Sequence, residues 1–151
     1  MAYIGLKLVA GGLAVLMLGC QSSGNTALQG TRWVLREMKA SGATAVPVSA
    51  GITPAITATF TEAQISGSSG CNSYSASYGV SDKQLAVSNL QVTRRACTDP
   101  KVMERERTYL GAIEGTNRYE LQRGQLVIYS SQQVDLVFGP ELEGRSPLNL
   151  S

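Results

Sequence analysis

Three cysteines are the residues whose chemistry is easiest to predict from this sequence. Cys20 follows an apolar run near the amino terminus, whereas Cys71 and Cys97 lie in the middle of the chain. If Cys20 accepts a lipid, Cys71 and Cys97 remain as an even pair, which in an oxidising compartment favours a disulfide. Two buried free thiols, or a redox or metal pair, are the alternatives. The chain has no CxxC motif and no histidine, and two thiols alone seldom bind zinc, so we expect a structural disulfide and no metal site.

The segment before Cys20 has the composition of a bacterial secretion signal. Lys7 supplies positive charge, residues 8–18 are uncharged and mostly apolar, and Gly19 places a small residue directly before the cysteine. The apolar run is too short for a membrane-spanning helix, which needs about 20 apolar residues, but it suits a signal peptide. The pattern resembles a lipobox, although Met17 stands where leucine is usual.

We therefore expect residues 1–19 to be a lipoprotein signal peptide and Cys20 to be the lipidated, palmitate-bearing first residue of the mature protein. Residues 20–27 are small and polar after the cysteine, which is typical of a flexible tether. Several acyl chains together make anchoring effectively permanent. Gln21 follows the cysteine instead of aspartate, which by resemblance to sorted lipoproteins favours the periplasmic side of the outer membrane over the inner membrane. The alternative is an ordinary signal peptide followed by a chance cysteine.

No catalytic constellation is visible in the sequence. Without histidine, a Ser-His-Asp or Cys-His arrangement is excluded. Ser68 and Ser69 lack both the GxSxG spacing and an SxxK motif. Glu104 and Glu106 are two positions apart on a predicted helix, so they point to different faces and do not form a carboxylate pair. We expect a protein that is not an enzyme, with no catalytic residues and no cofactor.

Two groups of side chains are candidates for a ligand or partner face. The first is basic and begins with Arg94 and Arg95; it could meet acidic lipid headgroups or another anionic partner. Acidic residues are interleaved with it, which favours a solvated, salt-bridged face. The second group is aromatic and could line a ligand cavity, although such residues more often fill a core. The remaining basic residues are Lys101, Arg105 and Arg107, the interleaved acids are Asp99, Glu104 and Glu106, and the aromatics are Trp33, Phe60, Tyr74 and Tyr78.

Length and charge limit the classes of protein that this chain can belong to. A chain of 151 residues allows one domain once a signal is removed. The formal net charge is +2, which gives no reason to expect nucleic acid as a partner. We expect a domain over residues 28–140, a frayed tail over 141–151, and a monomer.

Alternation of apolar and polar residues predicts many short strands and one helix. The helix is capped by Asp99, has Pro100 in its first turn and ends at Gly115. Its apolar face includes Val102 and Tyr109, whereas Glu106 is expected to face water. The strands are expected over residues 28–38, 55–60, 63–67, 74–80, 84–88, 90–97, 118–122, 125–129 and 133–138. The fold class is therefore mainly β with one helix, a small antiparallel partial β-barrel packed by that helix.

Two motifs and their flanking residues resemble the META domain family of HslJ-like heat-shock lipoproteins. The motifs are Gly70-Cys-Asn-Ser-Tyr74 and Thr93-Arg-Arg-Ala-Cys97, with Gly30-Thr-Arg-Trp33 before them. Arg95 stands where the family usually has methionine. The resemblance implies a small β-barrel-like domain with one packed helix, in envelope proteins linked to heat-shock expression and antibiotic tolerance. It brings no established ligand or enzymatic activity. The motif residues that it singles out are Gly70, Cys71, Asn72, Tyr74, Thr93 and Cys97.

These features favour a non-enzymatic outer-membrane lipoprotein that supports envelope integrity or stress tolerance. It would act by binding an unidentified envelope protein or lipid, while its own lipid holds it to the membrane. One alternative is a carrier that holds a small apolar ligand inside the curled sheet. A third reading, a protease-inhibitor-like module, depends only on the small disulfide-stapled scaffold.

Overall fold

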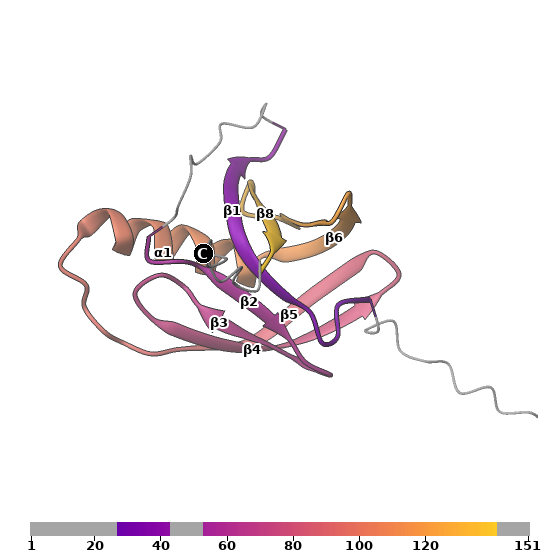
Figure 1. The fold of residues 1–151 in the computed structure, drawn as a ribbon, viewed down its shortest axis with the longest axis horizontal. Helices are drawn as coiled ribbons and strands as arrows, with labels where there is room; N and C mark the ends of the chain where they lie inside the picture. Colours follow the sequence, from indigo (N-terminus) through magenta and orange to yellow (C-terminus); the bar gives the residue numbers. More distant parts are fainter. Residues whose placement is uncertain (1–26, 43–52, 142–151) are drawn as a thin grey trace, which may run out of the picture.

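The computed structural model describes residues 27–42 and 53–141. The predicted signal peptide, the lipidated cysteine, nearly all of the tether and all but the first residue of the tail lie outside these residues. Eight strands and one helix follow one another along the described chain (Figure 1). They are β1 (Arg32–Ala40), β2 (Thr57–Phe60), β3 (Gln64–Ser68), β4 (Ser73–Ser81), β5 (Gln84–Val92), α1 (Pro100–Glu114), β6 (Thr116–Gln122), β7 (Gln125–Ser130) and β8 (Val134–Pro140).

The strands form a closed antiparallel barrel. Each strand pairs with the next in sequence, and β8 returns to pair with β1 over most of its length. The predicted class, mainly β with one helix, is confirmed, and the partial barrel of the prediction is in fact closed. Among the described residues, the strand pairing and the main hydrophobic core lie between Leu28 and Pro140, so this part of the chain has the contacts of a self-contained folding unit.

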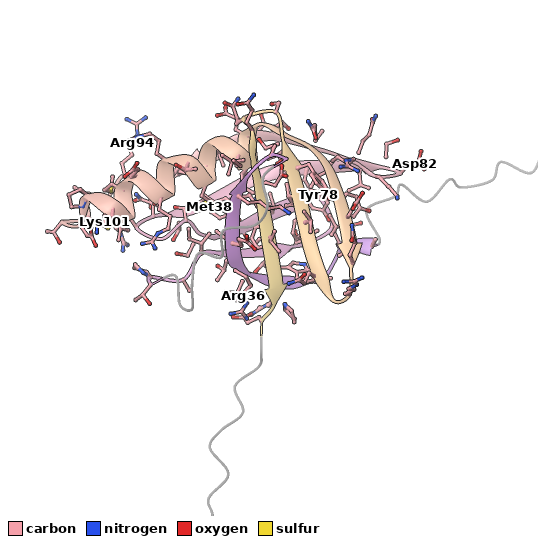
Figure 2. All side chains as sticks on the ribbon, turned by 90° about the horizontal axis from the view of Figure 1, so that it is seen from above. Arg36, Met38, Tyr78, Asp82, Arg94 and Lys101 are labelled. Carbon is pink, nitrogen blue, oxygen red and sulfur yellow. A yellow bond between two sulfur atoms is a disulfide. The ribbon has the colours of Figure 1, made fainter. Side chains whose placement is uncertain are left out.

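The join between β5 and β6 is the weakest in the barrel. Within the described residues, these strands share one register pair, Gln84 with Arg118, whereas β4 and β5 share seven. Helix α1 lies between β5 and β6 in the sequence and packs against β5, β7 and β8. Figure 2 shows α1 beside the strands, with the end that carries Lys101 projecting away from them. The helix thus covers the side on which β5 and β6 diverge.

The helix boundaries agree with the prediction. The Asp99 carboxylate accepts a hydrogen bond from the backbone N–H of Lys101 at 2.9 Å, and Gly115 ends the helix. The predicted strands at 84–88 and 90–97 are different in the structure. They form one strand, β5, in which Asn89 takes a positive φ of 54° beside a register shift opposite β4. Such a bulge lets one strand continue through a sequence that looks like a break.

Strand β5 ends at Val92, and residues 93–97 are not a strand. Their backbone is bonded to a corner of the barrel, as described below. No helix in the described part of the chain is long and apolar enough to cross a membrane.

Aromatic rings fill the barrel interior. Phe60 and Tyr78 meet edge to face with ring centroids 5.1 Å apart, and Tyr109 of α1 contacts the rings of Tyr74 and Phe138. The phenol groups remain hydrogen-bonded: the Tyr78 hydroxyl donates to the Thr61 carbonyl at 2.7 Å. Burial of aromatic surface of this kind is a main source of stability in a small domain.

Gly67 allows β2 and β3 to approach closely. A Cβ atom at Gly67 would lie 2.1 Å from the backbone oxygen of Thr57, whereas a Cβ atom at Gly79 would meet nothing within 4 Å. The Gly67→Ala variant is therefore expected to lose about 1–3 kcal/mol of unfolding free energy by overpacking. Gly79→Ala, the matched control, should stay within about 0.5 kcal/mol or gain slightly. Urea unfolding measures both, and equal effects at the two positions would contradict this account.

Candidate binding site

The two family motifs meet at one corner of the barrel. Cys71 and Cys97 form a disulfide with their Cα atoms 6.0 Å apart, which confirms the predicted pairing. The bridge joins the turn between β3 and β4 to the connection between β5 and α1. Gly70, the residue before Cys71, has a φ of 110°. Residues with a Cβ atom rarely adopt this backbone conformation, whereas glycine adopts it readily. Residues that are far apart in sequence are thus held together where the helix begins.

The Asn72 side chain bonds to three residues, two in the connection after β5 and one in α1. Its side-chain oxygen accepts from the Thr93 hydroxyl at 2.9 Å and from the Arg95 N–H at 2.7 Å. Its amide nitrogen donates to the Arg95 carbonyl at 3.3 Å and to Glu106 at 2.7 Å. Because Asn72 is buried, these bonds are needed to offset the loss of its hydration. Its hydrogen-bonding capacity is therefore used to fix the connection and the helix to the corner.

Glu106 is buried, which corrects the prediction that it faces water. Its side of α1 packs inward, and the residue is only 5% exposed. One carboxylate oxygen accepts from the Ser69 hydroxyl at 2.6 Å and from the Asn72 N–H at 2.8 Å, and the other accepts from the Asn72 amide. A signal for this was present in the sequence: Glu106 stands four residues after Val102 and three before Tyr109, on the apolar face of the helix.

The hydrogen bonds keep the Glu106 carboxylate ionised. Burial alone raises the pKa of this group, but donors from Ser69, Asn72 and the Cys71 backbone outweigh it, and the net pKa is lowered from 4.5. A carboxyl whose anion is stabilised in this way is a weak proton acceptor at neutral pH. The arrangement therefore acts as a structural tie between corner and helix and not as an acid–base pair.

Tyr74, the last residue of the first motif, continues this tie into the core. Its hydroxyl lies 3.0 Å from the Thr57 carbonyl, to which it donates, and 2.7 Å from the hydroxyl of Tyr109. Burial raises the pKa of both phenols well above 10.0. The two hydroxyls therefore stay protonated and link β2, β4 and α1.

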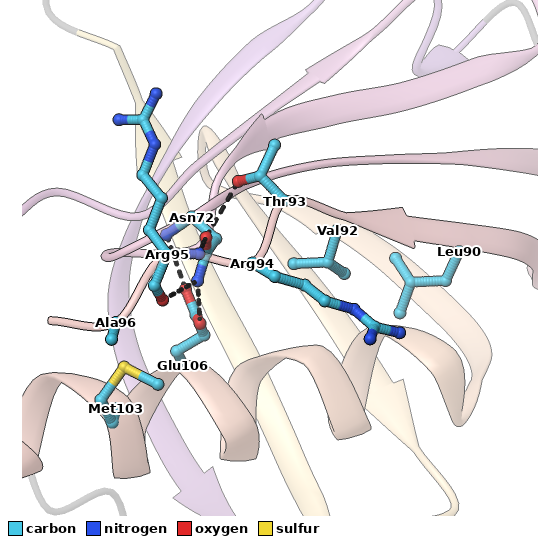
Figure 3. Close-up of a pocket in the computed structure, with 9 residues that line it drawn as sticks. All are labelled: Asn72, Leu90, Val92, Thr93, Arg94, Arg95, Ala96, Met103 and Glu106. Carbon is cyan, nitrogen blue, oxygen red and sulfur yellow. Dashed lines mark hydrogen bonds between the residues drawn. The ribbon is translucent and has the colours of Figure 1, made fainter.

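A groove of about 510 Å³ lies beside this corner, between the end of β5 and α1 (Figure 3). Leu90 and Val92 are half-buried on the strand side, and Met103 is half-buried on the helix side. Figure 3 shows the Arg94 side chain extending along the groove towards Leu90, whereas the Arg95 side chain points away from α1. The residues that line the groove are Asn72, Leu90, Val92, Thr93, Arg94, Arg95, Ala96, Met103 and Glu106.

The five residues predicted as a ligand or partner face lie in two separate places. Trp33, Phe60 and Tyr78 belong to the hydrophobic core of the barrel, which is the alternative that the sequence favoured for the aromatic group, so they do not form a ligand or partner face. Arg94 and Arg95 are exposed beside the groove. The sequence could not indicate the groove, because its two walls come from segments whose contact depends on Asn72 and Glu106.

The basic residues near α1 are exposed, except for the half-buried Arg105, and the predicted salt bridges with the interleaved acids are not formed. Within the described chain, the ion pairs join Arg32 to Glu141 and Arg118 to Glu120, both away from this region. Arg105 donates instead to the backbone carbonyl of Thr53 at 3.3 Å. The positive charge beside the groove is therefore available to solvent.

The fold and its site define a small disulfide-containing β-barrel domain with one structural helix. A model of the META domain family matches residues 26–142 of this chain. The chain belongs to the META domain family, and the corner described above is where that family's two motifs meet.

Solved structures show the same architecture. A protein from Burkholderia xenovorans, solved by NMR, is 25% identical with a TM-score of 0.64, over 94% of this chain and 99% of that one. Another protein solved by NMR is 29% identical with a TM-score of 0.59, over 77% and 93% of the two chains. A crystal structure of a DUF4847 family protein from Bacteroides vulgatus shares the fold at 9% identity, with a TM-score of 0.56 over 80% and 99%. Among curated protein sequences, none matches this chain significantly.

The Glu106→Gln variant tests the tie. The variant replaces one carboxylate oxygen, which accepts a hydrogen bond, with an amide nitrogen, which cannot. Because a buried donor then loses its acceptor, we expect a loss of about 1–3 kcal/mol in unfolding free energy at neutral pH. The pKa of Glu106 is lower in the folded protein than in the unfolded chain. The ionised carboxylate therefore stabilises the fold at pH values above the pKa of the unfolded chain, and this stabilisation is lost as the pH falls through the pKa of the folded protein. The difference in unfolding free energy between the wild type and the variant should therefore become smaller as the pH falls. Urea unfolding at a series of pH values from neutral to below 4.5 measures this difference. Glu104→Gln, on the exposed face, is the control; if it behaves the same way, Glu106 has no special role.

The disulfide adds a separate contribution to stability. A double variant, Cys71→Ser with Cys97→Ser, is expected to lose roughly 3–4 kcal/mol of unfolding free energy, because the bridge closes a loop and so lowers the conformational entropy of the unfolded chain. A reductant should destabilise the wild type to a similar degree and leave the double variant unchanged. Urea unfolding with and without reductant measures this. A reductant effect on the double variant would show that the loss has another origin.

Proposed function

We propose that this META domain protein is a lipid-anchored protein of the bacterial envelope, held on the periplasmic side of the outer membrane. It supports envelope integrity or tolerance of stress and antibiotics by binding another molecule, and it catalyses no reaction. The observation that carries the proposal is the bridge between Cys71 and Cys97. Of three cysteines in the chain, two are paired, and the third is the one in the lipobox-like segment.

The disulfide supports a compartment outside the cytoplasm. Structural disulfides persist in secreted and periplasmic proteins, whereas cytosolic thiols are kept reduced. The apolar run at residues 8–18 and the cysteine at position 20 point to the same compartment. A lipid on Cys20 would place the domain at a membrane surface through a short polar segment.

The use of the polar motif residues supports a binding role over a catalytic one. Ser69 and Asn72 both donate hydrogen bonds to Glu106. The polar groups of these three residues are therefore engaged within the fold. The alternative of a ligand carried inside the barrel has little support, because Trp33 and Phe60 are packed in the core. The groove outside the barrel is the better candidate for a binding surface.

The anchor is tested by replacing its acceptor. Cys20→Ala is expected to abolish incorporation of labelled palmitate and to leave the precursor at the inner membrane, because no thiol remains for lipid transfer. Ser22→Ala, two residues away, should be lipidated and sorted normally. Palmitate labelling and density-gradient separation of the two membranes measure both outcomes.

Two results would count against the proposal. If the Cys20→Ala protein still carried palmitate and reached the outer membrane, Cys20 would not be the acceptor. If a soluble periplasmic form fully restored stress tolerance in a deletion strain, the anchor would not be needed for function.

A further inference from the structure

The groove between β5 and α1 has a structural cause. Strands β5 and β6 pair only at Gln84 and Arg118 in the described chain, so the remaining length of β5 has no strand on that side. Helix α1 takes that place but approaches β5 less closely than a paired strand would. A space of about 510 Å³ remains beside Asn72, and its size is in the range of small-molecule sites.

Arg94 places an unpaired positive charge in this groove. Its side chain runs along the groove in Figure 3, and within the described residues it forms no ion pair and no hydrogen bond. A guanidinium presents donors in a planar fork that fits a carboxylate or phosphate. The other ionisable side chain facing the groove from α1 is Glu106, and its charge is held by the donors of Ser69 and Asn72. The Arg94 guanidinium lies at the far end of the groove from Ala96 and Met103.

Apolar surface lies next to this charge. Leu90 and Val92 are half-buried, and Figure 3 places both on the side towards which Arg94 extends. On the helix side lies Met103, whose flexible thioether side chain can adapt to ligands of different shape. A molecule that fits here needs an anionic group for Arg94 and an apolar body for Leu90 and Val92.

At Thr93 and Arg95 the backbone beside the groove is already hydrogen-bonded. A peptide that added as a strand would need free N–H and C=O groups along the wall. Here the Thr93 N–H is bonded to the Ser73 carbonyl, and both the N–H and the C=O of Arg95 are bonded to Asn72. A peptide therefore cannot pair with the backbone at this end of the wall, where a ligand meets charge and apolar side chains.

We propose that this groove binds a small amphipathic organic anion, a carboxylate or phosphate on an apolar chain, with Arg94 holding the anionic group. The inference goes beyond the proposed envelope role, because binding in solution requires no lipid anchor. The groove also lies at a distance from the start of the described chain. In Figure 1 the start of the described chain and the start of α1 lie on opposite sides of the domain, and Figure 2 shows Arg94 and Lys101 at the α1 side.

The test uses residues 21–151, which contain the whole closed barrel, and decanoate as the probe. Binding is followed by chemical shifts of backbone amides and of the Met103 methyl group, below the micelle concentration of the probe. We expect shifts confined to the segment 90–96 and to α1, with an affinity that falls as salt is added. Decanol and decyltrimethylammonium, which lack the anion, should bind at least about tenfold more weakly, because a charge-assisted hydrogen bond is lost.

The neighbouring arginines supply a matched pair of variants. Arg94→Gln should weaken decanoate binding about tenfold or more, whereas Arg95→Gln should stay within about twofold, because the Arg95 side chain points out of the groove. Both side chains are exposed, so neither change should alter the unfolding midpoint, and this is checked first. Decyl phosphate compared with decanoate shows which head group is preferred, and either preference agrees with the proposal.

Several outcomes would overturn the inference. These are an unchanged affinity in Arg94→Gln, an equal loss in Arg95→Gln, binding of decanol as tight as that of decanoate, or shifts in the barrel interior. Binding of inorganic phosphate alone as tightly as decyl phosphate would show that the apolar wall takes no part. Capture of an acidic extended peptide but of no amphiphile would assign the groove to a different class of ligand. None of these results would affect the lipidation test at Cys20, so the two proposals fail separately.

Discussion

The contact between Asn72 and Glu106 determines where every other part of the site lies. Both side chains are buried, and an unpaired amide or carboxylate in that environment would destabilise the fold by several kcal/mol. Their two mutual hydrogen bonds, at 2.8 Å from the Asn72 backbone N–H and at 2.7 Å from its side-chain amide, are formed only when the corner before β4 meets the middle of α1. The Ser69 hydroxyl and the Arg95 backbone complete the set. The cost of leaving these groups unpaired therefore fixes the helix to the barrel.

The disulfide and the tyrosine pair reinforce the same junction from two sides. The bridge from Cys71 to Cys97 lies next to Asn72 in sequence and closes the outer side of the corner. Tyr74 reaches inward to Tyr109 and thus couples the corner to the aromatic core. A covalent link, a buried polar network and an aromatic contact thus act on the same few residues. In this chain the two motifs therefore form the junction between the barrel and α1.

The barrel tolerates a weak join because of this junction. Strands β5 and β6 separate after one pair, and α1 lies where more strand would otherwise be needed. The arrangement leaves a groove with a free arginine on one side of an otherwise closed fold. A surface that can hold a ligand is thus a consequence of how the helix enters the barrel, and not of the barrel interior, which side chains fill.

Local features, which depend on neighbouring residues, could be predicted from the sequence. Alternating apolar residues gave the strands, and Asp99 with Pro100 gave the start of the helix, because caps and periodicity are short-range properties. Cysteine parity and compartment gave the pairing of Cys71 with Cys97. Only the tertiary structure decided the closure of the barrel, the burial of Glu106 and the split of the aromatics from the arginines. A glutamate on a helix is normally solvated, and its burial is favourable here because Ser69 and Asn72, more than thirty positions earlier, supply the donors. That pairing depends on the fold, since no local rule relates these residues.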